Sequence, residues 1–282
     1  MKLAYRIWNS SHFDIKNAQV PKLLLLHGMG GTGALWRPLA AGLEDRYAVL
    51  APDQRGHGES QIPHVTGSRI ETRYTPLDYG QDLVETLDEL EVKSCWVVGH
   101  SMGVRSACAL AHLKPELVRG LILIDLGFSG VAGGGLGEGL STFLKNFPMR
   151  FSSRAEARLF MDQNCPDPSM AQYLMAVAVP ISETEGGGLT FPFDKAALIS
   201  TIHAARDISV RKWVEEAAQN RIRVLALRGA RSLVWSREEF ERERAHFAGS
   251  PTIEFEEVPG AGHGLPFEKR AELTAKINNF LA

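Results

Sequence analysis

Five short apolar runs, separated by helical patterns, constrain the fold of this chain more than any other feature. They lack the polar–apolar alternation of a half-solvated strand, so each is expected to be a strand covered on both faces. Helical patterns lie between them, and Pro115 ends one of these. The alternation predicts an α/β fold, with a mostly parallel central sheet and helices on both faces. The runs are residues 22–26, 47–52, 95–98, 120–124 and 222–227.

Length and charge limit the function classes. The chain has 282 residues, of which 44% are hydrophobic, and a formal net charge of −2. It can therefore bury a full core, and its charge gives no reason to expect nucleic acid as a partner. No apolar run approaches the ~20 residues of a membrane span, and the first residues do not read as a secretion signal. Cys95 and Cys108 are expected in the core. We expect a cytoplasmic protein, and the sequence does not specify an oligomeric state.

Residues 127–215 interrupt the strand–helix alternation. They hold 7 of the 13 phenylalanines and 4 of the 7 methionines, between two glycine-rich stretches. This enrichment predicts a lid (cap) subdomain that packs over the active edge of the sheet. The core domain is then expected to comprise residues 1–126 and 216–282. An ordinary helical insertion with its own small core is the alternative interpretation.

The stretch "VVGHSMGVRS" places Ser101 in a G-x-S-x-G motif. A β-prone run precedes the motif and a helical pattern follows it, which is the context of a nucleophile elbow. Side chains at positions 99 and 103 would collide with the neighbouring strand and helix, so glycine is required at both. The helix that begins at Met102 directs its free N–H groups toward the same point. Ser101 is therefore the candidate nucleophile.

A serine needs a base to become nucleophilic at neutral pH. His263 lies in "VPGAGHGLPFEKRAEL", after a strand-like run and a glycine-rich turn, and is the candidate base. His27 and His57 lie in glycine loops, where we expect structural hydrogen bonding. Backbone N–H groups would stabilise the oxyanion, and the expected donors are those of Met102 and Met29.

Together, "LLLHGMGGT", "APDQRGHGES", "GHSMG" and "VPGAGHGLPFE" resemble the α/β-hydrolase superfamily, and specifically its small, lidded, esterase-like members. The resemblance runs from about residue 22 to the C-terminus. It implies a lid inserted after the sixth strand. It also implies hydrolysis of a carboxylic ester, thioester or related bond by a Ser-His-acid triad, without a metal or an organic cofactor.

The chain lacks the aspartate that usually serves as the acid of the triad in this superfamily. The usual aspartate follows the seventh strand in a turn such as G-x-x-S-D, and here that position is Leu233. Asp125, at the end of "GLILID", is the expected replacement, as in some members of the superfamily. Relatives with the ordinary acid also carry an aspartate there, where it fixes the start of the lid. Glu238, Glu239 and a dyad supported by water remain alternatives.

The substrate is expected to be a small, mainly apolar acyl compound. Met29 and Met102 favour an apolar pocket, and Phe128 and Trp213 are the candidate substrate-binding side chains. No cluster of basic residues in the loops requires a charged substrate, although Arg105 and Arg231 are close enough in sequence to expected site loops to approach it.

Three other interpretations stay open. A non-catalytic ligand-binding sensor on the same fold is compatible with the missing acid. A C–C hydrolase or lyase uses a similar triad. A dinucleotide-binding protein is indicated by Gly28, Gly30 and Gly33 in a G-x-G-x-x-G pattern, with Asp53 at the end of the next strand.

Overall fold

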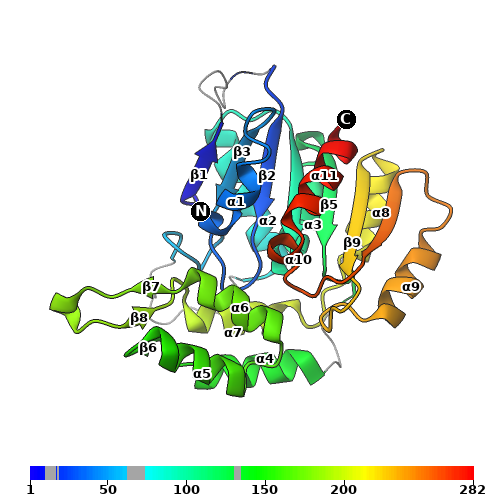
Figure 1. The fold of residues 1–282 in the computed structure, drawn as a ribbon. Coiled ribbons are helices and arrows are strands. Elements are labelled where there is room, and N and C mark those ends of the chain that lie inside the picture. Colours follow the sequence, from blue (N-terminus) through cyan, green and yellow to red (C-terminus); the bar gives the residue numbers. More distant parts are fainter. Residues whose placement is uncertain (10–16, 18, 62–73, 130–134) are drawn as a thin grey trace.

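The computed structural model describes residues 1–9, 17, 19–61, 74–129 and 135–282. Within these residues a seven-stranded sheet forms the centre of the molecule, and six of its strands run parallel (Figure 1). β1 alone pairs antiparallel, with β3. Across the sheet the order is β1 (Tyr5–Trp8), β3 (Ala48–Pro52), β2 (Lys22–Leu26), β4 (Cys95–His100), β5 (Val118–Ile124), β9 (Arg223–Gly229) and β10 (Ile253–Val258).

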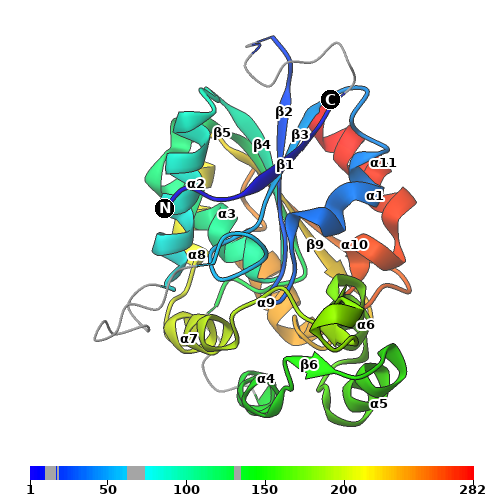
Figure 2. The same cartoon turned by 90° about the vertical axis from the view of Figure 1, so that its left-hand side faces the viewer.

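Helices cover both faces of the sheet, as the uninterrupted apolar strands require (Figure 2). Alternate strand residues point into two separate cores: Leu24 and Leu26 into one, Leu23 and Leu25 into the other. The first face is covered by α2 (Pro76–Glu89), α3 (Met102–Leu113), α8 (Arg211–Gln219) and α9 (Arg237–His246). The second is covered by α1 (Arg37–Ala40), α10 (Leu265–Glu268) and α11 (Arg270–Leu281).

An inserted segment, residues 135–205, lies across the ends of the central strands, beside the loops that follow them (Figure 1). It has its own core, in which Phe147 packs edge-on against Phe143, Phe151 and Phe191. Its backbone also bonds to loops that follow the parallel strands: the Gly58 N–H donates to the Pro192 carbonyl. Its elements are α4 (Gly135–Asn146), β6 (Arg150–Phe151), α5 (Arg154–Asn164), α6 (Pro168–Val177), β7 (Val179–Pro180), β8 (Leu189–Thr190) and α7 (Lys195–Ala205).

The α/β architecture with a mostly parallel sheet is confirmed, whereas the details of the insertion differ from expectation. Among the described residues the segment follows β5, which contains "GLILI", the run after which the lid is expected. The expected boundary at 215 falls inside α8, whose Val214 packs in the core beneath the sheet together with Val210. The glycine-rich residues 130–134 lie outside the described part of the chain.

None of the helices in the described ranges is long and apolar enough to cross a membrane.

Candidate active site

Ser101 lies at a sharp bend between β4 and α3. Its φ of 53° and ψ of −120° are values that non-glycine residues rarely adopt. A Cβ at Gly99 would lie 2.4 Å from the Gly103 carbonyl oxygen, and a Cβ at Gly103 would lie 2.4 Å from that of Leu26. The chain can therefore turn this tightly because both flanking positions are glycine. The bend leaves the Ser101 side chain half-exposed above the sheet.

A buried carboxylate and an imidazole meet beside this bend. The His263 Nδ1 lies 2.7 Å from the Asp125 Oδ2, and Asp125 is fully buried. Parallel pairing of β4 with β5, and of β5 with β9, brings the end of β5 to the edge where Ser101 emerges. Asp125 itself has a φ of 56°, a left-handed conformation that aspartate tolerates better than most residues.

The Asp125 carboxylate accepts two further hydrogen bonds. The Gly229 N–H donates to Oδ1 at 2.8 Å, and the Ser232 hydroxyl donates to Oδ2. Each oxygen of this buried carboxylate therefore has a hydrogen-bond donor. Ser232 immediately precedes Leu233, the position where the acid was absent, so the turn after β9 still contributes to the site through its serine. Sequence reasoning did not identify Ser232, although it is the serine of the G-x-x-S-D pattern.

The other acidic candidates lie elsewhere. Leu233 is 66% exposed, and the Glu238 carboxylate is at the surface, paired with Arg242. Glu239 lies against Gly127, where an added Cβ would be 2.5 Å from its Oε1. Among the described residues only Asp125 forms an ion pair with His263.

The His263 residue is fixed relative to the serine through His100. The His100 Nε2–H donates to the His263 carbonyl at 2.8 Å, and the two ring centroids are 4.9 Å apart. In the described part of the chain no hydrogen bond joins the Ser101 hydroxyl to the His263 ring. Such bonds are often long in ligand-free enzymes and tighten when substrate binds.

Met29 and Met102, whose backbone N–H groups are the expected oxyanion donors, belong to two chain segments near Ser101. Met102 begins α3, so its N–H has no intrahelical acceptor. Met29 follows Gly28, where an added Cβ would be 3.1 Å from the Ser101 Cβ. Among the described residues neither N–H donates a hydrogen bond, so both remain available to an oxyanion.

Three buried histidines surround the loop after β2 and stay neutral. Burial lowers the pKa of His27 to about 3, that of His57 to about 4 and that of His100 to about 3. His27 accepts from the Gln54 N–H at Nε2, and His57 accepts from the Gly30 N–H at Nε2. Their roles are those of hydrogen-bonding supports, as expected for His27 and His57.

Both expected substrate-binding side chains pack away from Ser101, and this corrects the sequence interpretation. Phe128 is fully buried between Trp235, Phe247 and Phe255, on the α9 side of the sheet. Trp213 stacks on His112, ten residues along α3 from Met102 and therefore about 15 Å away along the helix. Apolar character alone did not distinguish a core side chain from one that lines a site.

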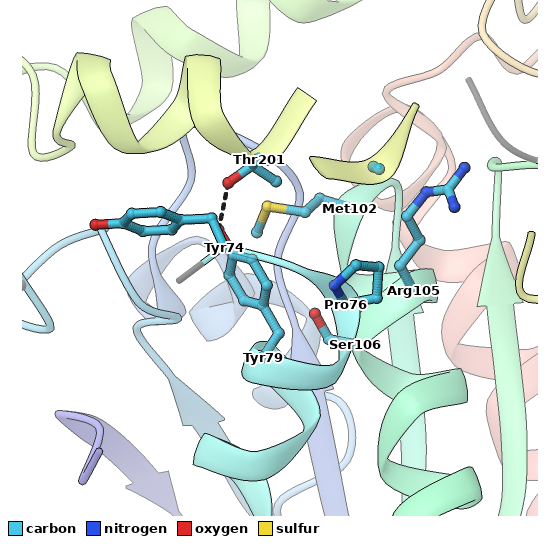
Figure 3. A pocket seen from close by; sticks show the side chains of 8 residues that line it. Tyr74, Pro76, Tyr79, Met102, Arg105, Ser106 and Thr201 are labelled. Carbon is cyan, nitrogen blue, oxygen red and sulfur yellow. Dashed lines mark hydrogen bonds between the residues drawn. The ribbon is translucent and has the colours of Figure 1, made fainter. Parts of the chain in front are cut away.

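A small pocket borders the Met102 side chain (Figure 3). It lies between α2, α3 and α7. Tyr79 and Thr201 close one side through a 2.7 Å hydrogen bond between their hydroxyls. Its lining residues are Tyr74, Pro76, Tyr79, Met102, Arg105, Ser106, Thr201 and Ala205.

The two arginines considered for the site have other partners. Arg105 contributes to the pocket wall, but its guanidinium donates to the backbone carbonyls of Ile208 and Ser129, each at 2.7 Å. Burial lowers the pKa of Arg105. Arg231 is exposed and donates to the Gly260 carbonyl.

The dinucleotide interpretation fails at Asp53. This fully buried carboxylate accepts from the Gly33 N–H at 2.7 Å, from the Glu59 N–H at 3.0 Å and from Arg6 at 2.8 Å. It therefore ties the loop after β3 to its surroundings and does not face a ribose site. Within the described ranges, no group of three or more His, Cys, Asp or Glu side chains is arranged to hold a metal ion.

Comparison with known proteins independently supports the resemblance to α/β hydrolases. A model described as the alpha/beta hydrolase family matches residues 23–277. A 2-(acetamidomethylene)succinate hydrolase from Mesorhizobium japonicum is 37% identical over 105 residues, which is 37% of this chain and 35% of that protein. The mouse (Mus musculus) sn-1-specific diacylglycerol lipase ABHD11 is 24% identical over 94% of this chain and 82% of its own.

Solved structures agree with the fold. The crystal structure of an E-2-(acetamidomethylene)succinate hydrolase superposes with a TM-score of 0.77 and 25% identity, covering 99% of this chain and 94% of that one. The chain thus spans about a third of the first curated relative by sequence and nearly all of this structure by shape.

Proposed function

Because the chain belongs to the α/β-hydrolase family, we propose that it is a serine hydrolase that cleaves a carboxylic ester, or a related acyl bond, of a small and mainly apolar substrate through an acyl-enzyme. One observation carries this proposal. The buried Asp125 carboxylate lies 2.7 Å from the His263 Nδ1, at the edge where the strained Ser101 bend emerges. An acid, a base and a nucleophile are therefore available in the order that acyl transfer needs.

The proposed reaction follows from these positions. Asp125 keeps the proton of His263 on Nδ1, which leaves Nε2 free to take the proton of Ser101. The Ser101 oxygen then attacks the substrate carbonyl, and the Met29 and Met102 N–H groups hold the oxyanion. His263 protonates the leaving group and afterwards activates water, which releases the acyl group from Ser101.

The inserted segment would act as a lid. Its contacts with loops at the carboxyl ends of the strands, such as the bond from Gly58 N–H to the Pro192 carbonyl, support a position above the site. A cover of this kind excludes water and strengthens electrostatic interactions with the oxyanion. Small apolar substrates are favoured by the Met29 and Met102 side chains, which pack together against Tyr74 and Tyr79.

The test is a panel of p-nitrophenyl esters of increasing acyl length, assayed with the wild type and Ser101→Ala. We expect Ser101→Ala to lose at least about 10³-fold in kcat. A fluorophosphonate probe should label the wild type once, as read by intact mass, and should not label Ser101→Ala. Ser182→Ala, at an exposed serine of the inserted segment, is the matched control and should be labelled normally.

The same panel of compounds distinguishes an ester hydrolase from a hydrolase of a different acyl bond and from a non-catalytic sensor. Because one relative is named for 2-(acetamidomethylene)succinate, that compound is included beside the esters. Turnover of this compound in preference to every ester would identify a different acyl bond on the same machinery. Binding without Ser101-dependent turnover of any member would refute the serine-hydrolase proposal and favour the sensor.

A further inference from the structure

We propose that Tyr173, in α6 of the inserted segment, is a positioning residue that sets the oxyanion hole by holding the Gly28 carbonyl. This inference rests on the proposed function, because it concerns how the same site stabilises an oxyanion. Tyr173 does not touch the reacting atoms in this account. It acts through the peptide group that joins Gly28 to Met29.

The Gly28 carbonyl accepts three hydrogen bonds. The His27 Nδ1–H donates at 2.8 Å, the Tyr173 hydroxyl at 2.9 Å and the Gly31 N–H at 3.0 Å. A trans peptide is planar, so its C=O and its N–H point in opposite directions. Donors that hold the Gly28 oxygen on one side therefore turn the Met29 N–H to the other side. The peptide that carries the proposed oxyanion donor is oriented by these three bonds.

The Tyr173 hydroxyl reaches this carbonyl through a space that Gly31 leaves open. A Cβ at position 31 would lie 1.7 Å from the Tyr173 oxygen and 2.7 Å from its Cζ. The ring itself packs against Phe267 and His100, with centroid distances of 5.5 and 5.9 Å. Burial raises the pKa of Tyr173, so the phenol stays protonated and remains a donor.

The three donors differ in origin. His27 and Gly31 belong to the same loop as Gly28, whereas Tyr173 comes from the inserted segment, 145 residues away in the chain. Displacement of α6 would break the Tyr173 bond and leave the other two. Correct seating of the inserted segment is therefore coupled to the orientation of the Met29 N–H, and so to stabilisation of the transition state.

Tyr173→Phe tests this directly, because it removes one oxygen and keeps the ring. We expect kcat for the best ester to fall about 10- to 100-fold, less than complete loss of an oxyanion donor. KM should change by less than about threefold, since the Gly28 carbonyl does not bind the ground state. Affinity for a trifluoromethyl ketone, which forms an oxyanion on Ser101, should fall in proportion to kcat/KM.

Tyr79→Phe is the matched control. It removes another buried tyrosine hydroxyl that bonds to the inserted segment, through Thr201 in α7. In the described part of the chain, no hydrogen bond joins the Tyr79 hydroxyl to residues 28–31. A general loosening of the inserted segment would affect both variants. The proposal expects the ketone affinity to fall in Tyr173→Phe alone.

Gly31→Ala gives a second route, because its Cβ would displace the Tyr173 hydroxyl. Its effect on kcat should not add to that of Tyr173→Phe, since both act through one hydrogen bond. Exchange of the Gly31 amide hydrogen, which donates to the same carbonyl, should quicken in Tyr173→Phe and reports on the loop without turnover. The inference would be overturned if Tyr173→Phe had the same kcat, the same ketone affinity and the same Gly31 amide exchange rate as the wild type. Absence of Ser101-dependent turnover in the wild type would instead refute the proposed function.

Discussion

Replacement of Asp125 by asparagine is the sharpest test of the candidate triad, because the structure fixes how the new amide must be oriented. The Gly229 N–H can only donate, and it lies 2.8 Å from the Asp125 Oδ1. The asparagine oxygen must therefore take the Oδ1 position. Its NH₂ group then takes the Oδ2 position, 2.7 Å from the His263 Nδ1.

This orientation reverses the tautomer of the histidine. An NH₂ group facing Nδ1 requires Nδ1 to accept, so the His263 proton moves to Nε2. Nε2 then cannot take the proton of Ser101, and the buried imidazolium that forms later loses its counter-charge. A change of this kind costs about 10³- to 10⁴-fold in kcat. That loss corresponds to an increase of about 4–5.5 kcal/mol in the activation barrier.

The substitution should not unfold the protein. Asparagine is nearly the same size as aspartate and tolerates the φ of 56° at this position at least as well. The Ser232 oxygen can accept from the new NH₂ group in place of its long, 3.4 Å contact with the Trp235 N–H. Circular dichroism and the midpoint of urea unfolding should therefore remain close to those of the wild type, which separates a catalytic loss from a folding defect.

The assay is kcat for the preferred p-nitrophenyl ester near neutral pH, with Glu239→Gln as the control. Glu239 lies against Gly127 and is the acidic alternative nearest to the start of the inserted segment. We expect Glu239→Gln to retain activity within about twofold. An Asp125→Asn enzyme within about tenfold of the wild type would refute the assignment of Asp125 as the acid.

Two further predictions concern stability. Burial lowers the pKa of His27 to about 3, that of His57 to about 4 and that of His100 to about 3. Below about pH 6.5 the unfolded chain therefore binds more protons than the native one. The free energy of unfolding should fall on acidification by up to about 1.4 kcal/mol per pH unit for each of these histidines. Urea unfolding between about pH 7 and pH 5 measures this, and a constant free energy over that range would contradict it. Phe128→Ala should lower the unfolding free energy by about 3–5 kcal/mol with KM little changed, because Phe128 is fully buried in the core; a large rise in KM without loss of stability would return Phe128 to the substrate site.

Local sequence was sufficient for the elbow. A bend that needs glycine two residues before and two after its centre is encoded within five consecutive residues, 99–103. The strand pattern was similarly local, because strands buried on both faces must be apolar throughout. The α/β class and the position of Ser101 at a strand–helix junction could therefore be predicted before any long-range contact was known.

The candidate acid of the triad could be identified only from the order of the strands in the sheet. In sequence, Asp125 and Glu239 are both carboxylates that follow a strand. Pairing of β5 between β4 and β9 places Asp125 beside His263 and the Gly229 N–H, and leaves Glu239 against Gly127. Which carboxylate meets the imidazole is a property of sheet topology.

Whether Phe128 lines the site also depended on tertiary structure, which buries its side chain in the core. The local pattern marks it only as apolar, and its surroundings are supplied by Trp235 and Phe247, on either side of α9, and by Phe255 in β10, more than a hundred residues later. Tyr173 had no local signal that singled it out, and the G-x-x-S-D pattern marked Ser232 only as the residue before the missing aspartate. The roles proposed for them rest on hydrogen bonds to groups 107 and 145 residues away.

The short-range sequence thus set where the backbone bends and which segments are buried, because those depend on steric and apolar properties of adjacent residues. Tertiary structure decided which polar groups meet at the bend, because a hydrogen bond between distant segments depends on strand order and on where the inserted segment rests.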